Sequence, residues 1–377
     1  MKFTIFSHVD HCLSKDQYYA YAPYVREMNL WIKNFDSVEI VAHISKKEIS
    51  NIDLAYSHQS LFFNSIKAFD LTSLKNIFFS LIYIPGIIMT IAKAMHRADH
   101  IHLRCPGNIG LLACLVQIFF PNKPKTAKYA GNWDPSAKQP WSYRLQKWIL
   151  NNTFLTRNMQ VLVYGNWEGI SKNIKPFFTA TYTSKEAKQS MLLQGKTIDL
   201  VNTIKFIFVG TLSVGKRPLY TLQLWHQLSK QHPNLKLEFY GEGAMRGDLE
   251  KYIMQYNLHD KVMLNGNQPK EVIEKAYQQS NFLILASNSE GWPKVVAEAM
   301  FWGCVPLSTN VSCVYEMMGF GTRGLLLEVD LDKDMKRVLE IINSEDIYIK
   351  MSNQSKVWST AYTLDTLEKE IAILLKK

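Results

Sequence analysis

The sequence predicts an α/β protein of two domains, each with a parallel β-sheet covered by helices. Its 377 residues exceed the size at which a single hydrophobic core stops growing, so two domains of roughly 150–200 residues are expected. Hydrophobic residues make up 47% of the chain, which is enough to fill two cores. Short apolar segments alternate with amphipathic segments of helical period, and this order is typical of parallel βα units.

Ten short apolar segments are the predicted strands, five in each part of the chain. Between the two groups, Lys185–Asn202 is polar and lacks long apolar runs, so it is the expected linker. The expected domains are therefore residues 1–198 and 199–377. The predicted strands are Thr4–Ser7, Val38–His43, His100–Leu103, Thr126–Tyr129, Val161–Tyr164, Lys205–Val209, Lys236–Tyr240, Lys261–Leu264, Asn281–Leu285 and Val305–Ser308.

Charge is distributed unevenly along the chain. Residues 1–200 hold 23 Lys and Arg against 13 Asp and Glu, whereas residues 201–377 hold 20 of each. The whole net charge of +10 therefore lies in the first part. Such an asymmetry favours an anionic partner there, either a membrane surface or a phosphate-bearing acceptor. Nucleic acid is not the expected partner, because the basic residues come singly or in pairs without a recognised nucleic-acid motif.

The amino-terminal run MKFTIFSHVDH alternates like a strand and lacks the features of a signal peptide, so a cytoplasmic protein is expected. The segment Ile77–Met95 is apolar enough to raise the question of a transmembrane helix. Pro85 and Gly86 in its centre and Lys93 near its end favour a helix that packs on the core or faces a membrane. The five cysteines form no CxxC pair, which indicates reduced thiols rather than disulfides or a zinc site.

Ligands of parallel α/β sheets bind beyond the carboxyl ends of the strands, so the loops at those ends are the candidate sites. The first such loop is VGTLSVGKRP, Val209–Pro218. Gly210 and Gly215 permit a tight turn, and Lys216 and Arg217 place two cations beside amides that a helix start leaves unpaired. This combination is typical of phosphate binding, with a glycine turn and two solvated cations as the alternative.

A second glycine loop, YGEGAMRG, begins at Tyr240 after the next predicted strand. Neither loop fits the dinucleotide pattern GxGxxG or the Walker pattern. The sequence therefore argues against a dinucleotide enzyme and against a P-loop ATPase.

A third loop lies in the stretch NSEGWPKVVAEAMFWGCVP, residues 288–306. Pro293 is the expected first-turn proline of a helix that runs to about Trp302. Glu290 would then lie just before the helix, whereas Glu298 would lie inside it among apolar neighbours. A buried acid needs a hydrogen-bonding partner, and the hydroxyls of a ribose would supply one. The alternative is one acid favoured by the helix dipole and one exposed helical glutamate.

Together the three loops resemble the donor half of the retaining glycosyltransferases of glycosyltransferase family 4, which have the GT-B fold. Two glutamates with seven residues between them are the signature of that family, and the resemblance covers roughly residues 205–330. The run ADHIHLR at Ala98 resembles the family's acceptor-side histidine strand. The stretch DQYYAYAPYVREMNLW resembles members that assemble bacterial surface polysaccharides.

The resemblance implies two Rossmann-like domains that face a central cleft. Residues 1–198 would bind the acceptor and residues 199–377 the nucleotide-sugar donor, with a last helix at about 362–377 crossing back to the first domain. The expected catalytic residues are Glu290, Lys216 and His102. The expected donor-binding residues are Gly210, Thr211, Lys216, Arg217, Gly241, Glu290, Gly291, Trp292, Pro293, Lys294 and Glu298.

Individual roles follow from the same resemblance. Lys216 would contact the donor diphosphate, Glu290 the sugar hydroxyls and Glu298 the ribose. Thr211 stands where the family has an arginine, so Arg217 is expected to supply the second cation. His102 matches the histidine strand in part, because Arg104 replaces the second histidine of the usual pair, and a core-facing strand histidine is the alternative.

The implied enzyme moves a sugar from a UDP- or GDP-linked donor to a saccharide or lipid-linked saccharide, with no bound metal or other cofactor. Two alternatives remain open, namely a GT-B nucleotide-sugar epimerase and a non-enzymatic protein that binds anionic surfaces. The expected location is the cytoplasm, peripheral on the inner face of the plasma membrane through the N-terminal half.

Overall fold

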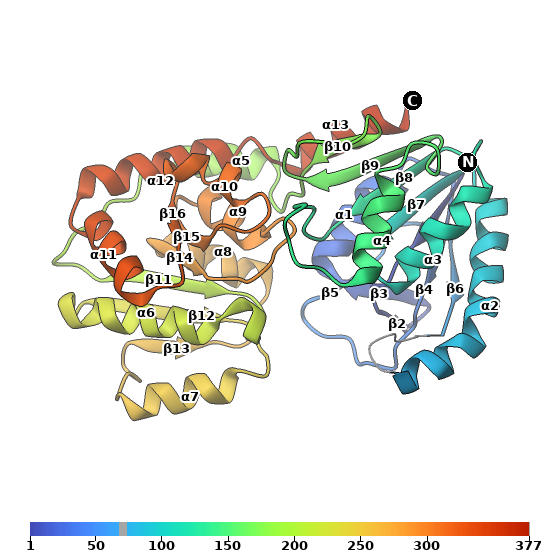
Figure 1. Cartoon of the computed structure of the whole chain (residues 1–377). Coiled ribbons are helices and arrows are strands. Elements are labelled where there is room, and N and C mark those ends of the chain that lie inside the picture. The colour runs from blue at the N-terminus through green and yellow to red at the C-terminus, as the bar shows by residue number, and fades with distance from the viewer. Residues whose placement is uncertain (68–73, 377) are drawn as a thin grey trace. The chain divides into compact units, whose positions relative to one another are not determined.

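The computed structural model describes residues 1–67 and 74–376. They form two compact units: unit 1 contains Met1–Phe178 and Glu368–Lys377, and unit 2 contains Thr179–Leu367. Each unit has its own parallel sheet with helices packed on it (Figure 1), as the sequence predicts.

The sheet of unit 1 has seven parallel strands in the order β10-β9-β8-β7-β1-β4-β6. All five strands predicted for this part of the chain are confirmed, and β6 and β10 are additional edge strands. A separate antiparallel sheet of three short strands, β2, β3 and β5, was not predicted. The bounds are β1 Lys2–Phe6, β2 His11–Ser14, β3 Gln17–Tyr21, β4 Ser37–Ala42, β5 Asp53–Ala55, β6 Leu61–Ser65, β7 His100–Cys105, β8 Lys125–Tyr129, β9 Met159–Tyr164 and β10 Ile174–Phe177.

Both faces of this sheet are covered by packed side chains. Neighbouring residues of one strand point to opposite faces, so the contacts of β1 show both coverings. On β1, Phe3 stacks against Trp31 and Phe35 on one side. Phe6 belongs to the apolar core formed with the helices of the other side. The helices are α1 Ala22–Ile32, α2 Leu74–Arg97, α3 Asn108–Val116, the 3-10 turn η1 Gln117–Phe119 and α4 Trp141–Leu150.

The apolar segment Ile77–Met95 lies within α2. Ile87 and Ile91 are buried in the core of unit 1, whereas Ile82 and Met89 are exposed. No helix within the described residues is both long and apolar enough to cross a bilayer. The expectation of a helix packed on the core is therefore confirmed.

The sheet of unit 2 has six parallel strands in the order β13-β12-β11-β14-β15-β16. The five strands predicted here are confirmed, and β16 is additional. Its strands are β11 Ile204–Val209, β12 Leu235–Tyr240, β13 Val262–Leu264, β14 Phe282–Leu285, β15 Val305–Thr309 and β16 Leu325–Leu327. Its helices are α5 Ser184–Leu192, η2 Val214–Lys216, α6 Pro218–Gln231, α7 Arg246–Gln255, α8 Lys270–Gln279, α9 Lys294–Phe301, α10 Val314–Met317, η3 Gly319–Gly321, α11 Leu331–Ile342 and α12 Glu345–Ser359. The last helix, α13 Leu364–Leu375, begins in unit 2 and continues into unit 1.

The division between the units differs from the expected one. It falls between Phe178 and Thr179 rather than between residues 198 and 199. The polar segment that was the expected linker contains α5, which begins with a capping box between Thr183 and Glu186. Ser190 of α5 donates a hydrogen bond of 2.6 Å to the carbonyl of Phe301, so polar contacts bind this segment to unit 2.

The end of the chain returns to the first unit, as expected. Residues from Glu368 onward, in α13, belong to unit 1. Figure 1 shows α13, in red, beside β10, and Glu370 forms an ion pair of 2.8 Å with Lys175 on that strand.

Candidate functional site

The candidate site lies at the carboxyl ends of the central strands of unit 2. The chain passes from β11 to its neighbour β12 on one side and later places β14 on the other side of β11. The loops that leave β11 and β14 therefore diverge at a topological switch point, where ligands of parallel α/β sheets bind. These loops are residues 210–217 and 286–293.

The glycine loops after β11 and β12 are in direct backbone contact. Gly210 and Gly241 have φ of 149° and 140°. A Cβ atom on Gly241 would lie 1.9 Å from the carbonyl oxygen of Gly210. The amide of Gly210 donates to the carbonyl of Tyr240 at 2.9 Å. Glycine is therefore required at residue 241 for two loops to meet, which gives the second loop a part in shaping the site.

The loops after β11 and β14 are joined by side chains and by backbone. The ammonium of Lys216 forms an ion pair with the carboxylate of Glu290. The amide of Asn288 donates to the carbonyl of Gly215 at 2.8 Å. The side chains of Lys216 and Glu290 are 28% and 10% exposed, so a ligand could still reach the ammonium. The structure thus brings together two of the expected catalytic residues, which lie 74 positions apart.

Arg217 lies at the same junction. Its backbone is left-handed, with φ of 49° and ψ of 52°, a conformation that costs a non-glycine residue about 1–2 kcal/mol. Its guanidinium donates to the carbonyl of Ala286, the residue after β14, at 3.2 Å. Thr211 has an exposed side chain on the same loop. The guanidinium of Arg217 therefore lies beside the loop after β14, and its role as the second cation stays a prediction.

Glu298 has partners of its own on α9. It accepts hydrogen bonds from the hydroxyl of Thr181 at 2.7 Å and from the phenol of Tyr277 at 3.3 Å. Burial, and next the Glu298 carboxylate, raise the pKa of Tyr277, so this phenol stays protonated and donates. No hydrogen bond among the described residues joins Glu298 to the Lys216–Glu290 pair. The two glutamates thus form two neighbouring polar sites, not one cluster.

The residues from Gly291 to Lys294 connect the Lys216–Glu290 pair to the surroundings of Glu298 along the chain. The carbonyl of Gly291 accepts from the thiol of Cys313 at 3.4 Å. Trp292 stacks near Trp358, with ring centroids 6.1 Å apart. Trp292, Lys294 and Glu298 line one small recess of unit 2. Pro293 directly precedes α9, so the helix begins one residue later than expected.

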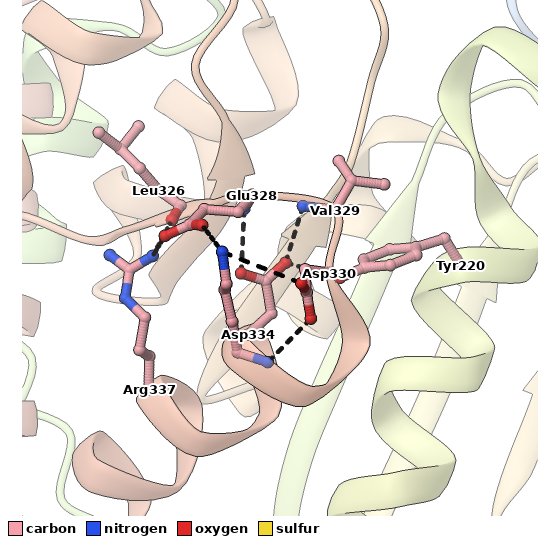
Figure 2. A network of polar contacts seen from close by, with 8 residues as sticks. Tyr220, Leu326, Glu328, Val329, Asp330, Asp334 and Arg337 are labelled. Carbon is pink, nitrogen blue, oxygen red and sulfur yellow. Dashed lines mark hydrogen bonds and ion pairs between the residues drawn. The ribbon is translucent and has the colours of Figure 1, made fainter.

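A buried carboxylate fixes the start of α6, the helix that follows the first glycine loop. Figure 2 shows Asp334, on α11, accepting hydrogen bonds from the phenol of Tyr220 at 2.6 Å and from the amides of Glu328 and Val329 at 2.9 and 3.0 Å. Tyr220 lies in the first turn of α6. Asp334 thereby links the loop after β16 to the helix start beside Arg217.

His102 lies in the core of unit 1 and fits the alternative of a core histidine. Its side chain is buried and packs 4.8 Å from the ring centroid of Trp31. Its Nδ1 lies 2.8 Å from the hydroxyl of Thr126, and burial holds the pKa of His102 well below its usual value. A strand that is covered on both faces buries its alternating side chains, so the structure shows His102 as a core residue, and its catalytic role stays a prediction.

Sequence reasoning missed Thr181, Tyr277 and Asp334. Thr181 and Tyr277 meet Glu298 only through the fold, across 117 and 21 positions. An acid on a buried helix needs hydrogen-bond donors. The sequence therefore indicates that Glu298 has such partners, but not which residues they are. Among the described residues, no three His, Cys, Asp or Glu side chains are grouped as a metal site requires.

Comparison of the whole chain with solved structures defines the fold class. Sucrose-phosphate synthase of Thermosynechococcus elongatus superposes with a TM-score of 0.67 at 16% sequence identity, over 100% of this chain and 98% of that one. The protein has the GT-B fold, with two parallel α/β sheets.

Residues 197–358 match the family described as Glycosyl transferases group 1. An uncharacterized glycosyltransferase of Haemophilus influenzae is 28% identical over 196 residues, which cover 52% of this chain and 55% of that protein. The N-acetylgalactosamine-N,N'-diacetylbacillosaminyl-diphospho-undecaprenol 4-alpha-N-acetylgalactosaminyltransferase of Campylobacter jejuni is 31% identical over 169 residues, 44% of each chain. The chain thus spans about half the length of these curated relatives.

Proposed function

We propose that this protein is a retaining glycosyltransferase that moves a sugar from a nucleotide-diphosphate sugar to a saccharide or lipid-linked saccharide acceptor. The observation that carries the proposal is the pairing of Lys216 with Glu290 at the switch point of a sheet in a glycosyl transferases group 1 domain. A cation there suits a diphosphate, and an acid beside it suits the hydroxyls of the attached sugar.

The reaction would break the bond between the anomeric carbon and the leaving diphosphate, on which negative charge builds up. Lys216 and Arg217 would stabilise that charge as it forms, since fixed cations in a partly buried site need no reorganisation. An acceptor hydroxyl would attack from the same face as the leaving group. Its oxygen would form the new bond to the anomeric carbon, and its proton would pass to the departing phosphate.

Glu298 would bind the nucleotide ribose. Its carboxylate already accepts from Thr181 and Tyr277, but two carboxylate oxygens offer about four acceptor sites, so ribose hydroxyls can also donate to it. Trp292 and Lys294 line the same recess and would bound the nucleotide.

The acceptor would be lipid-linked and met at a membrane during assembly of a bacterial surface polysaccharide. Three features support this part of the proposal: the net charge of +10 within residues 1–200, exposed apolar side chains on α2 that include Ile82 and Met89, and the diphospho-undecaprenol in the name of the Campylobacter relative. Each basic residue near an anionic surface contributes about 1 kcal/mol. Sedimentation of the full chain with anionic vesicles at low salt should fall in an Ile82→Glu, Met89→Glu double variant.

The test of the reaction is a screen of UDP- and GDP-sugars. A bound donor should raise the unfolding temperature by mass action, and adding a saccharide acceptor should release the nucleoside diphosphate. No stabilisation by any nucleotide sugar would contradict the proposal. Incubation with the donor alone separates the alternatives, because an epimerase would convert the sugar nucleotide without an acceptor and a pure binding protein would leave it unchanged.

A further inference from the structure

Unit 1 contains an open groove that the proposed donor reaction does not use. It lies between α4, the loop after β8 and the connection from β9 to β10, and its volume is about 470 Å³. That volume falls within the roughly 300–1,000 Å³ of pockets that bind small molecules.

One wall of the groove is aromatic. Trp148 of α4 lines it and is 61% exposed, whereas Trp133 lines it while almost fully buried. Trp133 is held in place by the ring of Tyr129, with centroids 4.9 Å apart, and by Lys147, whose Nζ lies 5.5 Å from its ring centre. An exposed tryptophan beside a rigid wall gives a flat apolar face whose edge is in water.

The groove is also lined by two asparagines, at the end of α4 and directly after it, whose side chains are held in place but keep free hydrogen-bond donors. The side-chain oxygen of Asn151 accepts from the amide of Ser171 at 2.9 Å. That of Asn152 accepts from the amides of Phe154 and Leu155 at 2.9 and 3.1 Å. Each bond fixes the amide oxygen, and within the described part of the chain neither NH₂ group makes a hydrogen bond. The groove therefore offers oriented donors.

The charges of the groove balance. The ammonium of Lys147 donates to the carbonyl of Asp134 at 3.0 Å and lies 5.5 Å from the ring centre of Trp133, so it is held against the protein. The carboxylate of Glu168 lines the groove, and among residues 1–67 and 74–376 it makes no ion pair or hydrogen bond. A free carboxylate accepts from hydroxyls and repels anions, which favours a neutral ligand over a phosphate.

We propose that this groove binds a neutral saccharide segment, with one sugar ring against Trp148, hydroxyls donating to Glu168, and hydroxyl oxygens accepting from Asn151 and Asn152. A sugar ring has an apolar C–H face and a rim of hydroxyls, so it matches a groove lined by an exposed tryptophan and by hydrogen-bond donors and acceptors. The inference stands apart from the donor site of unit 2, because saccharide binding requires no nucleotide.

The test uses the full-length protein labelled with 5-fluorotryptophan and followed by ¹⁹F NMR. Maltotetraose, cellotetraose, chitotetraose and mannotetraose are the probes. At least one of them should shift the Trp148 resonance, which a Trp148→Phe variant assigns. Trp148→Ala and Glu168→Gln should each weaken that binding by about tenfold, the scale of losing one anchor or one hydrogen bond to a charged group.

Trp141 provides the matched control, because it is equally exposed on α4 but does not line the groove. Trp141→Ala should leave the affinity within about twofold, a difference of under 0.5 kcal/mol. Absence of binding by all four probes, or equal losses in the two tryptophan variants, would overturn the proposal. Binding to anionic vesicles that both tryptophan variants abolish, without saccharide binding, would show instead a membrane-contact face. Nucleotide binding should be unchanged in every variant, and its loss would indicate that the variant is misfolded. If Trp148→Ala misfolds, Trp148→Phe is the second variant in which saccharide binding is measured.

Discussion

The ammonium of Lys216 and the carboxylate of Glu290 form an ion pair across the ends of two adjacent strands, β11 and β14. The two charges neutralise each other, so a diphosphate bound as we propose would share Lys216 with Glu290. Since Glu290 is the more buried partner, it is also the one that loses most if the cation is removed. Each residue therefore positions the other, and substitution of either changes both.

Lys216→Ala should lower kcat/KM by about 2–4 kcal/mol of transition-state free energy, the scale of losing one preorganised stabiliser. Steady-state kinetics with the donor identified in the screen measures this. Lys236→Ala is the control, because Lys236 is an exposed lysine on β12 of the same unit. A loss below about tenfold, or 1.4 kcal/mol, would remove Lys216 from the site.

The two glutamates should separate binding from transfer. Glu298→Gln should weaken binding of the free nucleotide, because the amide retains one acceptor oxygen and replaces the other by a donor, which faces either Thr181 or Tyr277. Glu290→Gln should lower the rate of transfer much more than nucleotide affinity. Calorimetry with UDP and GDP beside kinetics is the measurement, and the reverse order would refute both assignments.

The candidate site could be predicted from the sequence where its parts follow strands. Glycines, cations and an acid at strand ends have a local signal, so Gly210, Lys216 and Glu290 were identified. The partners of Glu298 have no such signal, because Thr181 and Tyr277 are ordinary residues that only the fold brings to this carboxylate. The role of His102 stays a prediction for a similar reason: a pattern of histidines on a strand does not reveal which face is covered, and the structure shows this side chain buried.

Gly241→Ala should destabilise the protein, because the new Cβ would overlap the carbonyl oxygen of Gly210 and the backbone φ of 140° disfavours an L side chain. A loss of about 1–3 kcal/mol in the free energy of unfolding is expected. Gly247→Ala is the matched control, since Gly247 lies in α7 with nothing within 4 Å of the added atom. It should stabilise the helix by about 0.5–1 kcal/mol. Urea unfolding measures the free energy of unfolding of both variants. Equal values for Gly241→Ala and Gly247→Ala would contradict the close approach of the loops.

The fold was predictable where apolar strands alternate with helices and was missed where strands are short or polar. The β2–β3 hairpin turns through Lys15 and Asp16, which have φ of 48° and 60°. Such a turn usually carries Asn-Gly or Asp-Gly, so the residues gave no signal. The edge strand β10 contains Pro176, which argues against a strand in the sequence although edge strands tolerate it.

Asp334→Ala should unfold unit 2 more easily and loosen the start of α6. It would leave the amides of Glu328 and Val329 and the phenol of Tyr220 without an acceptor, at a cost of about 3 kcal/mol or more. Asp332→Ala is the control in the same helix turn, where the exposed acid contributes at most about 1 kcal/mol through the helix dipole. Denaturation gives the stability, and donor affinity should fall in Asp334→Ala alone. If Asp334→Ala left the free energy of unfolding and the donor affinity unchanged, the network in Figure 2 would not be needed to hold α6.

Unit 1 should lose stability in mild acid because its core histidines resist protonation. Burial lowers the pKa of His11 and of His100 to about 4 and that of His102 well below its usual value. Above about pH 6.5, the pKa of histidine in an unfolded chain, these residues are neutral in both states and add no pH dependence. Between about pH 6.5 and 4 the unfolded chain binds protons that the folded chain does not, so falling pH favours unfolding.

A His100→Gln variant isolates one of these protons. The glutamine side chain would keep a polar partner for the hydroxyl of Thr126, which lies 3.0 Å from the Nε2 atom of His100. Near pH 5 the free energy of unfolding should then depend on pH less steeply by about 1.4 kcal/mol per pH unit, the value of one proton. His259→Gln is the control, because His259 is exposed in unit 2 and its removal should leave the dependence of the unit 1 transition unchanged. Identical pH dependence in the wild type and in His100→Gln would mean that His100 is protonated in the folded protein and that burial does not hold its pKa down.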